Sequence, residues 1–157
     1  MRYPTVTLLS LGLALGIPFA VHADVQGYWL SEEGTAQIEL APCEEGSEVI
    51  CGRIVWLEEP RGDDGEPLRD TNNDDPDLRD REILGLQMLR DMEPDDSRDR
   101  RWGGGRIYDP ESGNTYRARM DLSEDGDELD LRGYVGMAAF GRTSTWTREK
   151  ERREVED

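Results

Sequence analysis

The feature of this sequence that most constrains its fold is a two-residue alternation of apolar and polar side chains. Residues 36–40, 116–122 and 129–135 each place apolar or small residues at every second position, with mainly charged or polar residues between them. Successive side chains of a β-strand point to opposite faces of the sheet, so this pattern is typical of strands that bury one face. The sequence therefore predicts an antiparallel β-fold.

Turn-forming residues divide the chain into eight short segments. Stretches rich in Gly, Asp, Asn, Ser and Pro separate them, as at residues 109–114 and 123–127. Eight short strands joined by tight turns favour a closed barrel or a sandwich, and closure removes the exposed edges that invite aggregation. The segment at 83–90 fits a short helix equally well. The strands are predicted at residues 25–31, 35–42, 49–57, 83–90, 101–108, 114–122, 127–135 and 143–149.

One long acidic connection, residues 58–80, interrupts this series of strands. It consists mainly of Asp, Glu, Arg, Asn, Gly and Pro. Loops of this length within a small domain are usually either functional or poorly ordered. The connection is therefore a candidate interaction site.

The oxygen-bearing side chains of this loop raise the question of calcium binding. Asp70, Asn72 and Asp74 match the first, third and fifth positions of an EF-hand loop. Asp75 stands where the sixth position requires Gly, however, and Arg81 stands where the twelfth requires Glu. We therefore predict no metal site, with an irregular calcium site at Asp70, Asn72 and Asp74 as the weaker alternative to a solvated loop.

The N-terminus has the features of an export signal. Arg2 supplies the positive start, residues 6–21 are largely apolar, and Val21-His22-Ala23 fits a cleavage site. The apolar run is too short and too interrupted by Gly and Pro to span a membrane. We predict a signal peptide at residues 1–23, a periplasmic or secreted domain at residues 24–149, and a charged, frayed tail at residues 150–157.

The composition of the mature chain excludes several function classes. Cleavage after Ala23 removes one arginine and no acidic residue, which leaves 36 acidic against 18 basic residues and a net charge of −18. Nucleic acids and anionic lipid surfaces require a basic patch and are poor partners. Cleavage also removes His22, the single histidine, so that Ser–His or Cys–His catalysis and His-ligated metals are excluded.

Cys43 and Cys51 are predicted to form a structural disulfide. An even number of cysteines in an exported chain indicates a disulfide, and a separation of eight residues fits a bridge across a β-hairpin. A redox-active pair usually has Cys-x-x-Cys spacing, which is not found here. Closing so short a loop stabilises the fold by about 2.5 kcal/mol in the chain-entropy model.

An ordered series of motifs resembles a known bacterial family. The motifs are Gly27-Tyr28-Trp29, Cys51-Gly52-Arg53-Ile54-Val55-Trp56, Asp70-Thr71-Asn72, the segment from Trp102 to Pro110 with Tyr116, Arg132-Gly133-Tyr134-Val135-Gly136 and Thr145-Trp146-Thr147-Arg148. Together they resemble the exported family catalogued as domain of unknown function 2147, over essentially the whole mature chain. The resemblance implies a lipocalin-like barrel and no established enzymatic activity. One departure is the reshaped acidic segment 72–76, where the family usually has Asn-Pro.

Three residues support the lipocalin-like barrel independently. A Gly-x-Trp on the first strand and an Arg on the last are the hallmark pair of such barrels, and Gly27, Trp29 and Arg148 stand in these places. The first and last strands of a closed barrel are neighbours, so we expect the guanidinium of Arg148 to stack on the indole of Trp29.

The candidate ligand-binding residues are mainly aromatic. Gly103-Gly104-Gly105 lacks the Lys-Ser/Thr of a phosphate loop and is predicted to form a bulge or bend in a strand. The aromatic residues near it either line a cavity or pack in the core. The candidates are Trp102, Tyr108, Tyr116, Met120 and Tyr134.

The sequence predicts a non-catalytic protein, without a cofactor, that holds a small apolar or amphiphilic ligand in the barrel. This function rests on the fold analogy. Two alternatives remain open. One is a cell-envelope interaction module that presents the acidic loop 58–80 to a cationic protein partner. The other is a carboxylate-based hydrolase, which the missing histidine disfavours.

The excess of acidic residues has two open interpretations, a compositional bias or an adaptation to high salt. Salt screens like-charge repulsion, which destabilises the compact state of a chain with net charge −18. If the acidic excess is an adaptation to high salt, we expect the melting temperature of the mature protein to rise between low salt and molar NaCl. A melting temperature that stays flat in both NaCl and KCl leaves only the compositional explanation.

Overall fold

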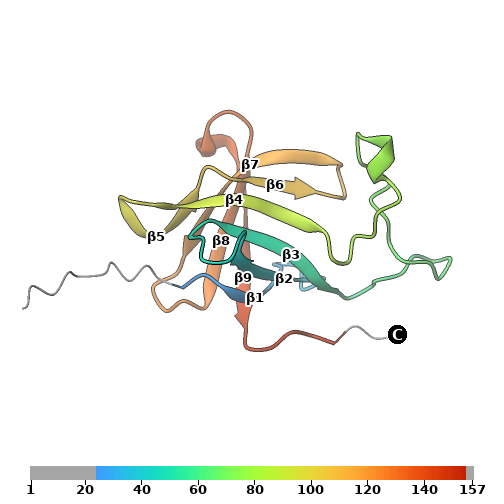
Figure 1. Cartoon of the computed structure of the whole chain (residues 1–157), viewed down its shortest axis with the longest axis horizontal. Coiled ribbons are helices and arrows are strands. Elements are labelled where there is room, and N and C mark those ends of the chain that lie inside the picture. The colour runs from blue at the N-terminus through green and yellow to red at the C-terminus, as the bar shows by residue number, and fades with distance from the viewer. Residues whose placement is uncertain (1–23, 155–157) are drawn as a thin grey trace, which may run out of the picture.

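The computed structural model describes residues 24–154 (Figure 1). The predicted signal peptide, residues 1–23, and the last three residues, 155–157, lie outside the described part of the chain. Within it, the elements follow the predicted alternation of strands and turns. None of its helical segments is long and apolar enough to cross a membrane.

The strands form one closed antiparallel barrel. Its order runs β3-β2-β1-β9-β8-β7-β5-β4, and β4 pairs again with β3. Two short 3-10 turns, η1 (Pro76–Leu78) and η2 (Ala138–Phe140), lie in the connections. The strands are β1 (Gly27–Leu30), β2 (Ala36–Pro42), β3 (Ile50–Leu57), β4 (Gln87–Asp95), β5 (Arg98–Gly103), β6 (Arg106–Asp109), β7 (Asn114–Leu122), β8 (Glu128–Tyr134) and β9 (Arg142–Glu149).

The strands β5 and β6 share one position between β4 and β7, so the nine strands form an eight-stranded barrel. Trp102 of β5 pairs with Met120 of β7, and Ile107 of β6 pairs with Tyr116 further along the same strand. Between them Gly104 has a positive φ of 75°. A Cβ on Gly105 would lie 2.4 Å from the carbonyl oxygen of Arg90. The glycines therefore form the predicted bend and allow the close approach of β4.

The predicted strand at 83–90 is wrong in its bounds, because β4 runs from Gln87 to Asp95. Leu89 and Met92 both face the core, with Asp91 in the left-handed region at φ 58° between them. This irregularity breaks the two-residue period and hides the strand from pattern analysis. Ile83 and Leu86 instead pack with Ile54 in a small second cluster.

The inward faces of the strands form the main hydrophobic core. Its fully buried large side chains include Trp29, Ile38, Leu40, Leu89, Met92, Met120 and Leu129. Gly52 has no room for a side chain, since a Cβ there would lie 2.9 Å from both Leu40 and Leu89. Burial of this apolar surface drives the closure of the sheet.

The predicted disulfide is confirmed. Cys43 and Cys51 are bonded, with their Cα atoms 4.9 Å apart, across the connection between β2 and β3. The backbone N–H of Cys43 also donates to the carbonyl of Val49, 2.8 Å away. The bridge therefore fixes the hairpin at the same end of the barrel as the start of β1, where Gly27 pairs with Leu40.

The first and last strands meet as expected, and Trp29 and Arg148 are direct partners in the β1–β9 pairing. The guanidinium carbon of Arg148 lies 4.3 Å from the centre of the Trp29 ring system. Its nitrogens donate to the carbonyls of Asp24, Gln26 and Gly126 at 2.9, 2.8 and 2.6 Å. Arg148 therefore links β9 both to the segment that precedes β1 and to the β7–β8 turn.

Within the tail that the sequence predicts to fray, residues 151–153 contact the barrel. The guanidinium of Arg153 pairs with Glu149 at 2.6 Å and lies 4.5 Å from the ring of Trp56. The buried Gln37 accepts from the backbone N–H of Arg153 and donates to the carbonyl of Glu151. These contacts with β2 and β3 hold the segment against the outside of the barrel.

We predict that Arg148→Lys destabilises the protein although it keeps the charge. The ammonium has no planar surface to stack on Trp29 and cannot reach all three carbonyls in the same geometry. We expect a loss of about 2 kcal/mol in the free energy of unfolding by urea titration. Arg117→Lys, at an exposed position of β7, is the control and should change little. Equal stability of the two variants would contradict this role of Arg148.

Candidate functional site

The barrel is open at the end opposite Arg148 and contains a cavity there of about 1170 Å³. Its walls come from the β1–β2 turn, the far end of β3, the start of β4, β6 and the facing parts of β8 and β9. The connection between β3 and β4, which extends to the right in Figure 1, adds Leu68, Arg69, Asn72 and Ile83 to the lining. The volume is above the range of about 300–1,000 Å³ usual for small-molecule sites.

The inner wall of this cavity is apolar. Ile38 of β2, Leu131 of β8 and Trp146 of β9 are buried side chains that also belong to the core. Ile54, Met88 and Ile107 continue this surface around the barrel. An apolar body that enters the cavity would lose its contact with water against these side chains.

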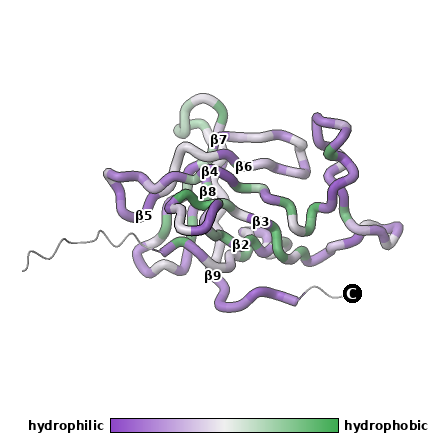
Figure 2. The backbone as a smooth tube through the Cα atoms, in the orientation of Figure 1, coloured by the Kyte–Doolittle hydropathy of each residue, from purple (hydrophilic) through white to green (hydrophobic). Residues whose placement is uncertain are grey.

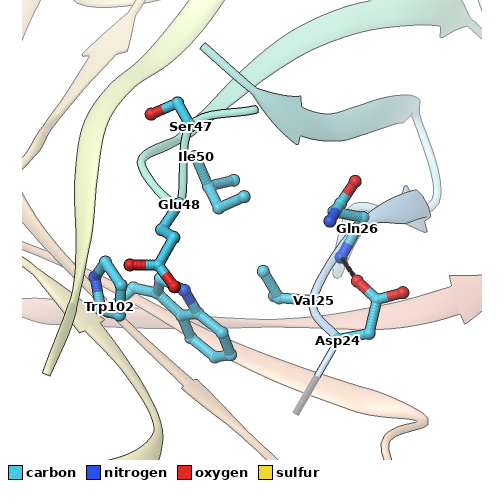
Figure 3. A pocket seen from close by; sticks show the side chains of 8 residues that line it. Asp24, Val25, Gln26, Ser47, Glu48, Ile50 and Trp102 are labelled. Carbon is cyan, nitrogen blue, oxygen red and sulfur yellow. Dashed lines mark hydrogen bonds between the residues drawn. The ribbon is translucent and has the colours of Figure 1, made fainter. Parts of the chain in front are cut away.

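The structure places the five predicted ligand-binding residues in three different environments. Tyr108, Tyr116 and Tyr134 line the large cavity. Met120 is fully buried in the core. Trp102, also buried, lines a smaller hollow of about 320 Å³ beside Asp24, Val25, Gln26, Ser47, Glu48 and Ile50 at the other end (Figure 3).

Several lining residues of the large cavity were missed by the sequence analysis. Ser144 and Trp146 point inward from β9, and Val135 and Phe140 come from the connection between β8 and β9. The alternation of Ser144 and Trp146 with the threonines Thr143, Thr145 and Thr147 was a usable signal. Nothing in the sequence pattern indicated that Val135 and Phe140 are at the mouth.

The connection between β8 and β9 exposes apolar side chains beside the mouth. Val135, Met137 and Phe140 are 76, 65 and 80% exposed, and the segment stands out as hydrophobic at the top of Figure 2. Arg132 fixes its shape by donating to the carbonyls of Ala138 and Ala139. The exposed side chains therefore lie on a turn whose backbone is fixed by hydrogen bonds.

A buried carboxylate anchors the acidic loop to the barrel. Asp70 has no exposed surface. It accepts from the hydroxyl of Tyr108 at 2.5 Å, from the amide of Asn73 at 2.8 Å and from the Nη2 of Arg81 at 2.7 Å. Tyr108 belongs to β6, so this network joins the middle of the loop to the wall of the barrel.

The network controls the protonation of both its acidic groups. Burial by itself raises the pKa of Asp70, but the hydrogen bonds from Tyr108, Asn73 and Arg81 and the charge of Arg81 outweigh it, so that the pKa lies below its ordinary value. Burial, together with the hydrogen bond to Asp70 and its charge, raises the pKa of Tyr108. At neutral pH, Asp70 is therefore a carboxylate and Tyr108 a hydrogen-bond donor.

The residues considered for calcium binding are not arranged as a metal site. The oxygens of Asp70 already face Tyr108, Asn73 and Arg81, and the amide of Asn72 donates to the carbonyl of Glu111 at 2.8 Å. Asp74 is exposed. Over residues 24–154 there is no group of three or more His, Cys, Asp and Glu side chains that could hold a metal ion.

A close backbone approach holds the same loop against the β6–β7 turn. Gly113 has a φ of +73°, and a Cβ at this position would lie 1.9 Å from the carbonyl oxygen of Asn72. Only a glycine fits there. The loop and the turn together form one side of the cavity mouth, through Asn72, Pro110 and Glu111.

Comparison with known proteins gives one family and one similar structure. The family model described as "Uncharacterized protein conserved in bacteria (DUF2147)" matches residues 27–148. A protein of the human pathogen Helicobacter pylori, described as belonging to the lipocalin family, has a similar structure with a TM-score of 0.65 and 23% identity. The similarity covers 82% of this chain and 84% of the other. A search of functionally curated proteins finds no significant match.

We predict that Asp70→Asn destabilises the fold by about 2 kcal/mol. The amide has no charge to neutralise Arg81, and its NH2 group would face groups that now donate hydrogen bonds to the carboxylate. Since the folded-state pKa is below the unfolded one, Asp70 stabilises the wild type at pH values above the ordinary Asp pKa of about 3.9. This contribution disappears as the pH falls through the folded value. Urea unfolding between pH 7 and pH 3 should therefore show a smaller acid-induced loss in the variant. The exposed Asp74→Asn is the control, and equal pH dependence of both variants would contradict the assignment.

Proposed function

This chain belongs to the DUF2147 family of bacterial proteins, and we propose that it binds a small apolar or amphiphilic molecule in the open end of its barrel without transforming it. The observation that carries the proposal is the cavity of about 1170 Å³ with apolar inner walls. Each methylene group buried from water contributes roughly 0.8 kcal/mol, so that an alkyl chain of moderate length gains enough to bind.

The fold supports this function. An eight-stranded barrel is the size at which the interior either fills with side chains or holds one small ligand. In this chain the core fills the end closed by Arg148, and the lipocalin-like architecture leaves the other end hollow. Charged residues at the mouth favour an amphiphilic ligand over a purely apolar one.

The electrostatics of the barrel support binding rather than hydrolysis. A carboxylate-based hydrolase needs one carboxyl group with a raised pKa as its general acid. The buried carboxyl nearest the cavity, Asp70, instead has a lowered pKa, because its hydrogen bonds and Arg81 outweigh its burial. The sequence from Asp24 onward also contains no histidine to replace it.

We place this binding function in the periplasm or outside the cell. The N-terminal 23 residues have the composition of a signal peptide. The Cys43–Cys51 bond is of the kind that persists in an oxidising compartment.

The second candidate function is an interaction of the acidic loop with a cationic protein. Asp63, Asp64, Asp74, Asp75 and Asp77 are exposed on this loop, while Asp70 anchors it. The loop therefore presents its negative charge on a backbone that is fixed to the barrel. Such an interaction would need these carboxylates and not the interior of the cavity.

We predict that Ser144→Trp weakens binding of the neutral probe N-phenyl-1-naphthylamine at least tenfold, a loss of about 1.4 kcal/mol. Ser144 is a half-buried lining residue of β9, so the indole would occupy the cavity. Thr147→Trp, on the exposed face of the same strand, is the matched control. Probe fluorescence measures both. Unchanged probe binding by Ser144→Trp would refute the cavity as the binding site. If that variant still bound a cationic protein partner, this would favour the acidic loop as the interaction site.

A further inference from the structure

The charged groups around the cavity indicate the kind of ligand that it takes. We propose that the ligand is a cationic amphiphile, with an apolar body inside the barrel and a positively charged group, such as a protonated amine, at the mouth. This inference rests on the proposed function, since it concerns the same cavity, and it adds the charge of the ligand. It is based on which of the charged lining residues already have hydrogen-bond or ion-pair partners in the structure.

The two cationic lining residues already have partners. Arg69 donates through Nη1 to the carbonyl of Asp80, and Arg142 faces Glu33 with 3.8 Å between Nη2 and Oε1. A ligand with a carboxylate or phosphate head would have to compete for these groups. These two arginines are also outnumbered by the five acidic residues of the lining, which disfavours an anionic head group at the mouth.

The acidic lining residues are more numerous, and three of them have no partner. Asp109 accepts from the backbone N–H of Glu111 and from the hydroxyl of Ser112. The carboxylates of Glu58, Glu59 and Glu111 are exposed, and they form no hydrogen bond or ion pair with any side chain or backbone group between residues 24 and 154. Glu58 lies near enough to Arg153 for its charge to help raise the pKa of that guanidinium, so its charge is partly offset, whereas Glu59 and Glu111 leave uncompensated negative charge at the entrance.

The arrangement in depth gives the orientation of the ligand. Ile38, Leu131 and Trp146 form an apolar inner wall, whereas the unpaired carboxylates are at the solvent-exposed rim. An ammonium group at the rim keeps part of its hydration and gains attraction from the carboxylates, while the alkyl chain is buried. Tyr116 and Tyr134, which also line the cavity, add aromatic faces that attract cations.

The test compares three probes with the same alkyl chain and different head groups: decylamine, decanol and decanoate. Binding to the mature protein is measured by titration calorimetry at neutral pH and low salt. We expect decylamine to bind roughly tenfold more tightly than decanol, and decanoate to bind more weakly than decanol. We also expect the preference for the amine to shrink as salt is added, because the rim is exposed.

Two variants of equal charge separate the rim from the general acidity of the protein. The first combines Glu58→Gln, Glu59→Gln and Glu111→Gln at the mouth. The second combines Glu44→Gln, Glu45→Gln and Glu124→Gln, exposed positions in the β2–β3 and β7–β8 turns at the other end of the barrel. We expect the first variant to bind decylamine and decanol about equally and the second to keep the preference. Unchanged decanol binding in both shows that the cavity is intact.

The outcomes distinguish this inference from the proposed function. Equal binding of the three probes by the wild type, or an equal loss of amine preference in both variants, would overturn the cationic ligand but leave the binding cavity standing. Tighter binding of decanoate than of decylamine would overturn it as well. If none of the probes binds, or if Ser144→Trp binds them as the wild type does, the proposed function itself is wrong.

Discussion

The structure depends on the closure of the barrel between its first and last strands. β1 has only four residues, and its place in the sheet is fixed from both sides by β2 and β9. Arg148 reinforces this seam by stacking on Trp29 and by donating to three carbonyls at the barrel end. The positive φ of Gly27, 119°, brings the backbone within reach of the same guanidinium.

Closure at one end determines what the other end can do. The large core side chains, such as Trp29, Leu40 and Met120, fill the end of the barrel that Arg148 closes. The disulfide holds the β2–β3 hairpin at this same end. At the other end the interior is hollow, and the β3–β4 and β8–β9 connections line the edge of the opening. A stable barrel and a hollow mouth are thus compatible, because the core does not need to fill both ends.

The strong negative charge of the chain is placed so that it hardly disturbs this arrangement. In Figure 2 most outer connections are hydrophilic, apart from the β8–β9 connection at the top, while hydrophobic residues follow the inner strands. Asp70 is the one completely buried carboxylate of the described chain, and its hydrogen bonds and the charge of Arg81 outweigh its burial and keep it ionised. It converts an acidic loop, which would otherwise be repelled from an acidic protein, into a fixed part of the mouth.

The sequence alone determined the β class, the disulfide, the glycine bend and the contact between Trp29 and Arg148, because each depends on a local period, a spacing or the topology of a closed sheet. The tertiary structure decided the bounds of β4, where an irregularity at Asp91 breaks the period. It also decided which aromatic residues belong to the core and which to the cavity. Tyr116 and Met120 share one face of β7 and one alternation, yet Tyr116 lines the mouth and Met120 is buried. Their depth along the barrel depends on the strands and loops packed around them, which a pattern within a single strand does not contain.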